Sequence, residues 1–169
     1  VRGTAAHGAY AYMGVDAILL AAQLVTILHT IVPQRIPAVE NAAIQIGMIH
    51  GGTKENNLTA RVELGGTVRT FGSEIRQTLF KEIERACGVV KALGGDYQLT
   101  IKEGFPPMFN DPALTAFARE VASALVGPKA VLSPKPELGS EDFAFYAQLA
   151  PGCFISLGAG VPGQPLRPL

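Results

Sequence analysis

The sequence predicts an α+β domain with the ferredoxin-like order strand–helix–strand–strand–helix–strand, followed by a partial α/β layer. Three observations predict it. Side chains alternate between apolar and polar over residues 60–71, two long segments carry apolar residues at helical spacing, and Pro106-Pro107 separates these elements from a second pattern. The predicted sheet is four-stranded and antiparallel, with both helices on one face and a truncated first strand. We therefore assign residues 1–105 to one domain and residues 106–169 to a second.

The first predicted helix follows residues 1–9, which we interpret as the end of a strand leading into a turn that contains His7. Asp16 is a good N-cap, and Pro33 is expected to end the helix at about Val32. Its surface is apolar nearly all round, except for a polar stripe formed by Gln23, Thr26 and Thr30. Such a helix must be covered on more than one side, which predicts a contact with a partner subunit. Because the apolar run is interrupted and shorter than the roughly 20 residues of a membrane span, we expect no membrane segment.

The next elements are two strands, a helix and a third strand. In residues 41–49 one face is expected to carry Ala42, Ile44, Ile46 and Met48. After the Gly51-Gly52 loop, a second strand should point Val62, Leu64 and Val68 to one side and Arg61, Glu63, Thr67 and Arg69 to the other. Ser73 is expected to cap a helix that reaches about Leu93, where Gly94-Gly95 ends it. Residues 97–101 alternate as a third full strand.

The second domain begins with a helix that Asp111-Pro112 starts and Gly127-Pro128 stops. We predict a short strand over residues 130–132, a short helix that reaches Leu149, and a buried strand over residues 153–157. Two strands and two helices form a poor core by themselves, so this domain is expected to be part of a larger α/β layer.

Composition excludes several classes of function. The 169 residues include 14 basic and 14 acidic side chains, and no cluster of Lys or Arg predicts nucleic-acid binding. Hydrophobic residues make up 48% of the chain, enough for a packed core. Cys87 and Cys153 fit no metal-ligand spacing, and we interpret them as small buried apolar residues of a cytoplasmic protein.

The residues that could carry chemistry are few. Asn56 lies on the predicted loop and Arg69 near the far end of the following strand; an amide and a guanidinium together suit a small carboxylate ligand. His7, His29 and His50 are isolated, so no metal ligands are predicted in this chain. By itself, His7 in a turn of small residues is equally well explained as a solvated or capping side chain. Nucleophile elbows, phosphate loops and dinucleotide fingerprints are absent from the sequence.

Several short motifs nevertheless occur together and in order. The chain resembles the aminoacylase/hippurate hydrolase-type metallopeptidases, the N-acyl amino acid amidohydrolases related to carboxypeptidase G. The resemblance covers essentially the whole chain, and its motifs are His7-Gly8-Ala9, Gly14-Val15-Asp16-Ala17-Ile18, Gly51-Gly52-Thr53, Gly66-Thr67-Val68-Arg69-Thr70-Phe71, Asn110-Asp111-Pro112, Gly139-Ser140-Glu141-Asp142-Phe143 and Leu157-Gly158-Ala159-Gly160.

The resemblance implies a catalytic domain with two divalent metals, zinc or manganese, interrupted by a lid domain of ferredoxin-like order that forms a homodimer. It implies that His7 contacts the scissile carbonyl, possibly in the partner subunit's active site. It also implies that Asn56 and Arg69 hold the carboxylate of the substrate's amino-acid part, and that Gly139 and Ser140 bind substrate.

Departures from the family pattern favour a chain without its own metal site. The His-x-Cys-Gly-His-Asp type of run that holds the metals is missing, and Arg167 stands where a C-terminal histidine ligand is expected. A guanidinium has no lone pair to offer a metal. Ala11 and Tyr12 replace a proline and a second histidine after His7. The sequence thus predicts a fragment or partial homologue of a metal-dependent amidohydrolase of N-acyl amino acids, inactive without a missing N-terminal catalytic half. The alternative is a non-catalytic dimerisation or carboxylate-binding module.

Overall fold

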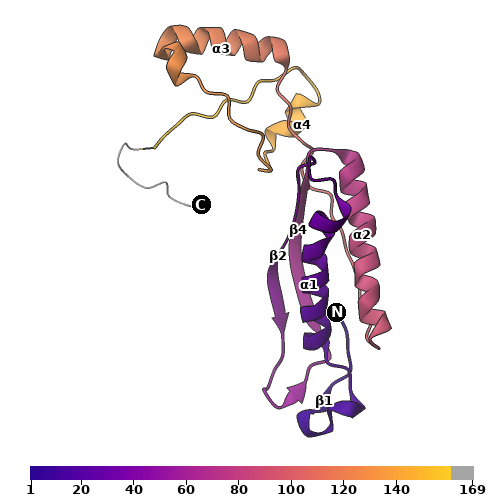
Figure 1. The fold of residues 1–169 in the computed structure, drawn as a ribbon. Coiled ribbons are helices and arrows are strands. Elements are labelled where there is room, and N and C mark those ends of the chain that lie inside the picture. The colour runs from indigo at the N-terminus through magenta and orange to yellow at the C-terminus, as the bar shows by residue number, and fades with distance from the viewer. Residues whose placement is uncertain (161–169) are drawn as a thin grey trace. The chain divides into compact units, whose positions relative to one another are not determined.

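The computed structural model describes residues 1–160, and these divide between two compact units (Figure 1). Val1–Gly104 form the first unit, and the second begins at Phe105. The first contains β1 (Ala6–His7), the 3-10 helix η1 (Gly8–Met13), α1 (Ala17–Arg35), β2 (Ala42–Gly51), β3 (Asn57–Leu58), β4 (Val62–Thr70) and α2 (Ser73–Ala92). The second contains α3 (Pro112–Val126), the 3-10 turn η2 (Pro128–Ala130) and α4 (Phe143–Ala147).

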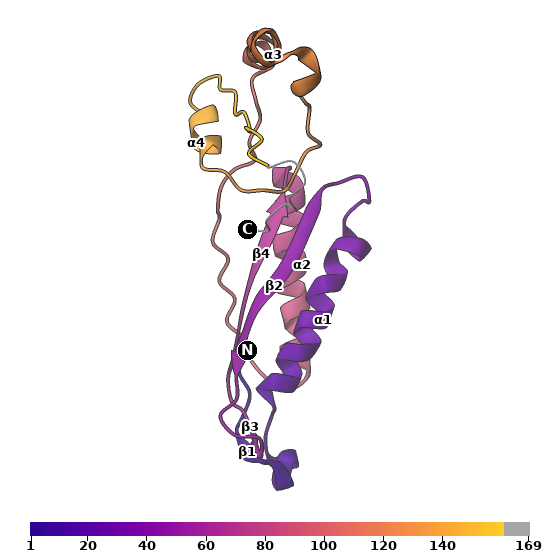
Figure 2. The same cartoon turned by 90° about the vertical axis from the view of Figure 1, so that its left-hand side faces the viewer.

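The first unit is built on a long antiparallel hairpin of β2 and β4, one face of which is covered by α1 and α2 (Figure 2). Val62, Leu64 and Val68 face the helices, as the alternation predicted, because every second side chain of a strand points to the same face. The helices meet over this face and bury Leu20, Leu24 and Leu28 of α1 against Leu79, Ile83 and Val90 of α2. The core of the first unit therefore lies between one sheet face and two helices.

Local signals in the sequence set the helix boundaries, with two corrections. The Asp16 carboxylate accepts the backbone N–H of Ile18 at 2.9 Å, so it caps α1 as predicted. The helix does not end at Pro33 but continues to Arg35, because a proline in the last turn removes only one hydrogen bond and the backbone N–H of Ile36 still reaches the Val32 carbonyl. In α2 the N-cap is Gly72 rather than Ser73, which is the first helical residue. Gly94 follows the helix at φ +86°, a conformation that suits glycine.

A β-bulge corrects the prediction for the face of Met48. Ile46 pairs with Gly66 and Met48 with Gly65, so Gly47 is an extra residue in β2. One inserted residue reverses the alternation that follows it. Ala42, Ile44 and Ile46 pack against the core as predicted. Met48 instead lies on the opposite face, over Gly65.

Residues 97–101 do not form the predicted third full strand. Only the residue before them, Asp96, forms a bridge, and its partner is Arg2. A strand needs a neighbour that supplies ladder hydrogen bonds, and among the described residues none runs beside 97–101. The structure therefore contains a long hairpin and the short pair β1–β3, and the four-stranded sheet is not formed within residues 1–160.

By its length and composition alone, α1 could cross a bilayer. The core helices of globular proteins often meet the same two criteria, and no other helix within residues 1–160 meets them. Its buried residues pack against α2 and the hairpin. These contacts account for its apolar character along the side that faces the core. Ile18 and Leu19 remain exposed on the other side.

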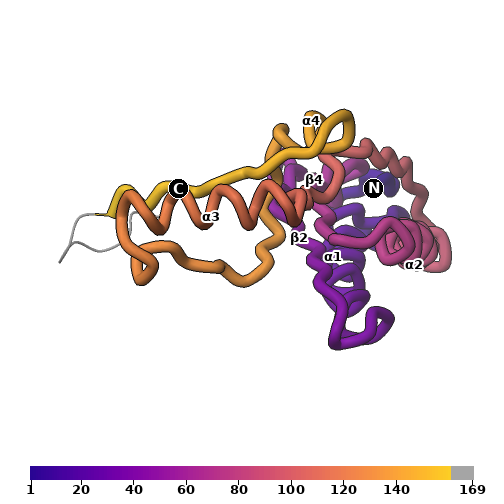
Figure 3. The backbone as a smooth tube through the Cα atoms, turned by 90° about the horizontal axis from the view of Figure 1, so that it is seen from above, coloured from indigo at the N-terminus to yellow at the C-terminus, as the bar shows by residue number. Residues whose placement is uncertain are grey.

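The second unit is organised around α3, which lies between two extended segments (Figure 3). Asp111 caps α3 by accepting the backbone N–H of Leu114 at 2.8 Å, and Gly127 follows its last turn, both as predicted. The strands predicted at 130–132 and 153–157 are not formed. Ala130 belongs to the turn η2, and the side chains of Ile155 and Leu157 are exposed rather than buried. The short helix is present as α4 but ends at Ala147.

Candidate functional site

The turn that follows His7 brings two of the predicted site residues together. β1 pairs with β3 in an antiparallel register that places His7 opposite Asn57. The backbone N–H of Gly8 donates to the carbonyl of Asn56 at 2.7 Å. A Cβ atom at Gly8 would lie 3.0 Å from that oxygen, so a glycine permits this close approach. The pairing therefore places His7 and Asn56 side by side at one end of the first unit.

The hydrogen bond of His7 determines which ring nitrogen carries the proton when the imidazole is neutral. Nδ1 accepts the backbone N–H of Ala9 at 3.1 Å and must therefore be unprotonated. The proton is then on Nε2, and His7 is exposed. The arrangement leaves an N–H donor available for a carbonyl oxygen or an oxyanion.

Two exposed tyrosines accompany His7 on the same turn. The rings of His7 and Tyr10 have centroids 6.0 Å apart, and those of Tyr10 and Tyr12 are 6.5 Å apart in an edge-to-face arrangement. The exposed fractions of Tyr10 and Tyr12 are 55% and 84%. In the family pattern Tyr12 stands out only as the replacement of a histidine. The two tyrosines spaced two residues apart in a turn of small residues are the sequence signal for this exposed aromatic group.

Arg69 lies near the C-terminal end of β4, whereas Asn56 precedes the N-terminal end of this strand. It pairs with Ala43, and its Nη1 donates to the Thr67 hydroxyl at 2.8 Å. β4 rises by about 3.3 Å per residue, so Arg69 lies roughly 23 Å along the strand from Val62, while Asn56 precedes that strand. One copy of the first unit cannot hold a single carboxylate with both Asn56 and Arg69.

Gly139 and Ser140 belong to the second unit. Both are exposed, in a segment that precedes α4 and has no regular secondary structure. Beside them, Glu141 Oε1 accepts the backbone N–H of Asp142 at 3.1 Å. This local contact gives Glu141 a structural partner within its own segment.

Asn110 has a structural role that its motif did not predict. Its side-chain amide donates to the Phe154 carbonyl and its Oδ1 accepts the Phe154 N–H, both at 2.9 Å. The amide thus acts like a strand partner for the backbone of Phe154. Its Nδ2 also lies 3.7 Å from the Sγ atom of Cys153. The motif Asn110-Asp111-Pro112 is therefore explained by its contacts within the second unit.

Residues 1–160 contain no cluster of side chains that could bind a metal ion. No three His, Cys, Asp or Glu side chains of that range lie close enough to hold one. His7, His29 and His50 lie in β1, α1 and β2 respectively. Arg167, the predicted replacement for a histidine ligand, lies outside the described residues. The donors of residues 1–160 therefore do not fit a metal.

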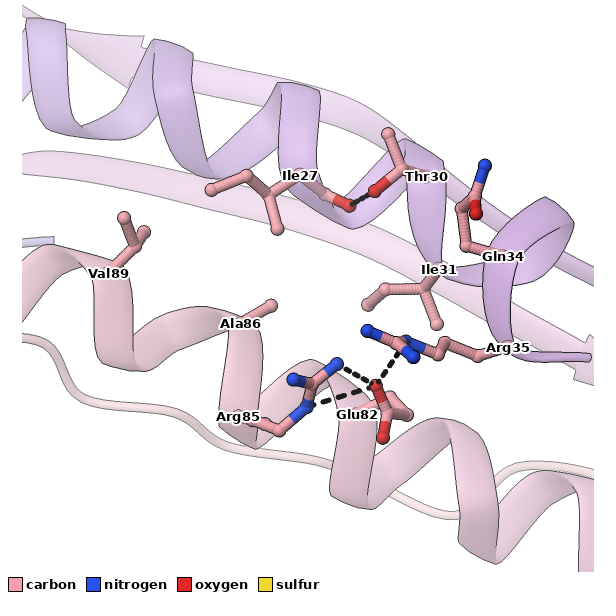
Figure 4. Close-up of a pocket in the computed structure, with 9 residues that line it drawn as sticks. All are labelled: Ile27, Thr30, Ile31, Gln34, Arg35, Glu82, Arg85, Ala86 and Val89. Atoms are coloured by element: carbon pink, nitrogen blue, oxygen red, sulfur yellow. Dashed lines mark hydrogen bonds and ion pairs between the residues drawn. The ribbon is translucent and has the colours of Figure 1, made fainter.

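A groove of about 390 Å³ lies between α1 and α2, away from these residues (Figure 4). Glu82 Oε2 is shared there by Arg35 at 3.5 Å and by Nε of Arg85 at 3.1 Å. Exposed ion pairs of this kind contribute little to stability. None of the predicted site residues lines the groove.

Comparison with known proteins identifies the family. Residues 3–166 match the profile of peptidase family M20/M25/M40. The chain belongs to this family.

Two bacterial relatives illustrate the similarity in sequence. A hydrolase of Sinorhizobium fredii is 35% identical over 165 residues, which are 97% of this chain and 41% of that protein. An N-acetyl-L-cysteine deacetylase of Bacillus subtilis is 33% identical over 162 residues, covering 94% of this chain and 38% of the enzyme.

Among solved structures, a candidate aminohydrolase of methicillin-resistant Staphylococcus aureus is 31% identical with a TM-score of 0.80, covering 99% of this chain and 43% of that one. An M20 peptidase of Bacillus subtilis, described as a dinuclear metal-binding peptidase, is 27% identical with a TM-score of 0.65. The match covers 89% of this chain and 37% of that one. This M20 chain thus has an α/β fold of aminohydrolase type and spans about two fifths of the length of these relatives.

Proposed function

We propose that this chain forms the lid and the C-terminal part of a metal-dependent amidohydrolase that cleaves the amide bond of N-acyl amino acids. Membership of the M20 family over residues 3–166 carries the proposal. The names of relatives, including an N-acetyl-L-cysteine deacetylase and an IAA-amino acid hydrolase, support an amide substrate. Two divalent ions, zinc or manganese, would have to be held by residues outside the described part of the chain. The chain alone is then inactive.

In this proposal His7 stabilises the charge that develops on the carbonyl oxygen of the amide. Its Nε2–H is free because Nδ1 is engaged by Ala9, so the ring can donate without a change of tautomer. A donor that is already oriented costs no reorganisation when the oxygen becomes negative. The hydrogen bond to Ala9 thus acts as a positioning contact for the catalytic donor.

Asn56 and Arg69 are proposed to bind the carboxylate of the amino-acid part. Because they lie at opposite ends of β4, both can contact one carboxylate only if they come from different copies of the chain. The proposal therefore includes a homodimer. The outer edge of β2 supports it, because the sequence of β2 contains no Asp, Glu, Lys, Arg or Pro to prevent pairing with a second strand. The exposed Ile18 and Leu19 of α1 would add apolar surface. Gly139 and Ser140 stay proposed substrate contacts from the second unit.

A chimera tests the proposal. Residues 3–166 of this chain replace the aligned part of the Bacillus subtilis N-acetyl-L-cysteine deacetylase, and hydrolysis of N-acetyl-L-cysteine is measured with zinc or manganese. The expected result is an active chimera in which His7→Ala lowers kcat by about 100-fold, the loss typical of one oxyanion donor. His29→Ala, on an exposed helix position, is the matched control. A folded, active chimera that is indifferent to His7→Ala would refute the role of His7.

A second candidate is a non-catalytic module that dimerises or binds a small carboxylate. It is favoured by the lack, within residues 1–160, of three clustered metal donors. A chimera that folds and binds metal but hydrolyses no N-acyl amino acid, together with calorimetric binding of such acids that Arg69→Ala abolishes, would select this candidate over the hydrolase.

A further inference from the structure

The groove between α1 and α2 has a charged end and an apolar end (Figure 4). Arg35, Glu82 and Arg85 meet at the end that lies near the C-terminus of α1. Ile27 of α1 and Val89 of α2 line the opposite end. A groove whose polarity changes along its length suits a ligand that is itself charged at one end and apolar at the other.

The charged end carries more positive than negative charge. Glu82 Oε2 accepts a hydrogen bond from Nε of Arg85 at 3.1 Å and lies 3.5 Å from Nε of Arg35. Within residues 1–160 the Arg35 guanidinium has no other polar partner. The side chain of Glu82 is 21% exposed, whereas those of Arg35 and Arg85 are 52% and 62% exposed. One carboxylate thus serves two cations, and the charged groups that a ligand can reach are mainly the two guanidiniums.

This charge balance favours an anionic ligand. Two guanidiniums that share one carboxylate repel each other, and a second anion between them would relieve that repulsion. The guanidinium presents its N–H groups as a planar fork, which matches the two oxygen atoms of a carboxylate. An ammonium head group would instead meet the uncompensated positive charge. The charged end therefore selects a carboxylate.

The apolar end is lined by side chains that the core covers only in part. Ile27, Ala86 and Val89 are half-buried, and Ile31, next to the charged end, is buried. An aliphatic chain laid over them would remove apolar surface from water. The volume of about 390 Å³ is near the lower limit for small-ligand sites, which is about 300 Å³. The groove therefore has room for one short chain.

We propose that this groove binds a small carboxylate of the fatty-acid type, with a single aliphatic chain of medium length. Its carboxylate lies between Arg35 and Arg85, and its chain lies over Ala86 toward Ile27 and Val89. The charge fixes the orientation of the ligand, and burial of the chain supplies most of the binding free energy. All contacts come from two helices of the first unit, so binding does not require the proposed hydrolytic activity.

A titration of the full chain with octanoate at neutral pH, followed by amide NMR, tests the site. The expected result is a set of saturable shifts at Ile27, Ile31, Ala86 and Val89. Acetate, which has the head group without the chain, should bind at least about tenfold more weakly. The uncharged 1-octanol should bind about fivefold more weakly. Raising NaCl from about 20 to about 500 mM should weaken octanoate binding, because salt screens exposed charges, and should leave 1-octanol binding unchanged.

Variants of the two ends complete the test. Arg35→Gln and Arg85→Gln should each raise the octanoate dissociation constant about fivefold, the effect of losing one exposed charge contact. Arg61→Gln is the matched control, because Arg61 is an exposed arginine that pairs with Glu63 at 3.9 Å and does not line the groove; it should change the constant by less than about twofold. Ala86→Leu keeps both arginines, fills the groove and should also weaken binding. Urea midpoints verify that each variant is folded.

Three results would overturn the proposal. The first is a lack of saturable shifts at these four amides with millimolar octanoate. The second is equal affinity for octanoate and 1-octanol, which would mean that the guanidiniums play no part. The third is an equal loss of affinity in the Arg35→Gln, Arg85→Gln and Arg61→Gln variants, which would mean that octanoate responds only to the overall charge of the chain.

Discussion

His7 illustrates how a backbone contact can determine the chemistry of a side chain. The sequence identified the residue, through the motif His7-Gly8-Ala9, but not the tautomer. The Ala9 N–H fixes that by donating to Nδ1, and this contact exists only because η1 begins directly after β1. The state of the ring therefore depends on local backbone geometry, which a motif alone does not specify.

Cys87 supports a prediction about reactivity and pH. Burial raises the pKa of its thiol, with a smaller contribution from Glu84. At about pH 8 we expect Cys153, which is half-buried, to react with a disulfide reagent well before Cys87. Stopped-flow absorbance on Cys87→Ser and Cys153→Ser separates the two rates. Faster labelling of Cys87 in the native state would contradict the burial that the structure gives it.

The raised pKa of the Cys87 thiol also makes the free energy of unfolding depend on pH. The folded state holds the Cys87 proton more tightly than the unfolded chain, so its contribution is complete below the ordinary pKa of a thiol, about 8.5, and is lost as the pH rises above it. Urea midpoints of the native chain should fall from pH 7.5 to pH 9.5 by more than those of Cys87→Ser.

Individual residues were predictable where their partners are close in the chain. Asp16 and Asp111 cap helices because their carboxylates reach amides two and three residues away. The sequence predicts that Asn56 and Arg69 hold one carboxylate together, but the distance between them was not predictable, since it depends on where the ends of β4 lie. The sequence offset between them carries no information on that separation.

At the scale of elements, periodicity predicted α2 well because its apolar residues form a single stripe. Leu79 belongs to that stripe and is fully buried, whereas Leu93, just beyond the helix, is 47% exposed. Leu79→Ala should therefore lower the free energy of unfolding by about 2–5 kcal/mol, and Leu93→Ala by less than about 1 kcal/mol. Chemical denaturation of both variants measures the difference, and equal losses would contradict this packing.

The alternation of apolar side chains did not predict strands correctly where strand formation depends on a neighbouring strand. Residues 97–101 alternate as a strand should, yet within residues 1–160 no adjacent strand pairs with them and they form none. Residues 153–157 have an apolar sequence but are held by the amide of Asn110 rather than by a ladder. A pattern of side chains predicts which face is apolar, while strand formation also requires backbone partners from elsewhere.

At the scale of the whole molecule, the chain spans about two fifths of the length of its M20 relatives, and the proposed function makes its activity depend on assembly. If two copies pair through the outer edge of β2, Gln45, near the middle of that strand, lies close to its counterpart. Gln45→Lys would place two cations together and should raise the dimer dissociation constant at least tenfold, which corresponds to about 1.4 kcal/mol. Sedimentation velocity over a concentration series gives this constant.

Thr67→Lys is the matched control, because Thr67 is also exposed but belongs to β4, which is flanked by β2 on one side. It should leave the dissociation constant within a factor of about two. A native chain that stays monomeric at all concentrations, or two lysine variants with equal effects, would rule out the β2 edge as the interface.

Gly47 makes the length of β2 as important as its composition. Deleting this one codon would remove the bulge but keep the faces, because Met48 would follow Ile46 directly and would still point away from the helices. Inserting a second residue beside Gly47 would instead reverse the tail of the strand, turning Met48 and His50 toward the helices and Ile49 toward water. Natural variation in this region should therefore tolerate loss of the bulge residue far more readily than a further insertion.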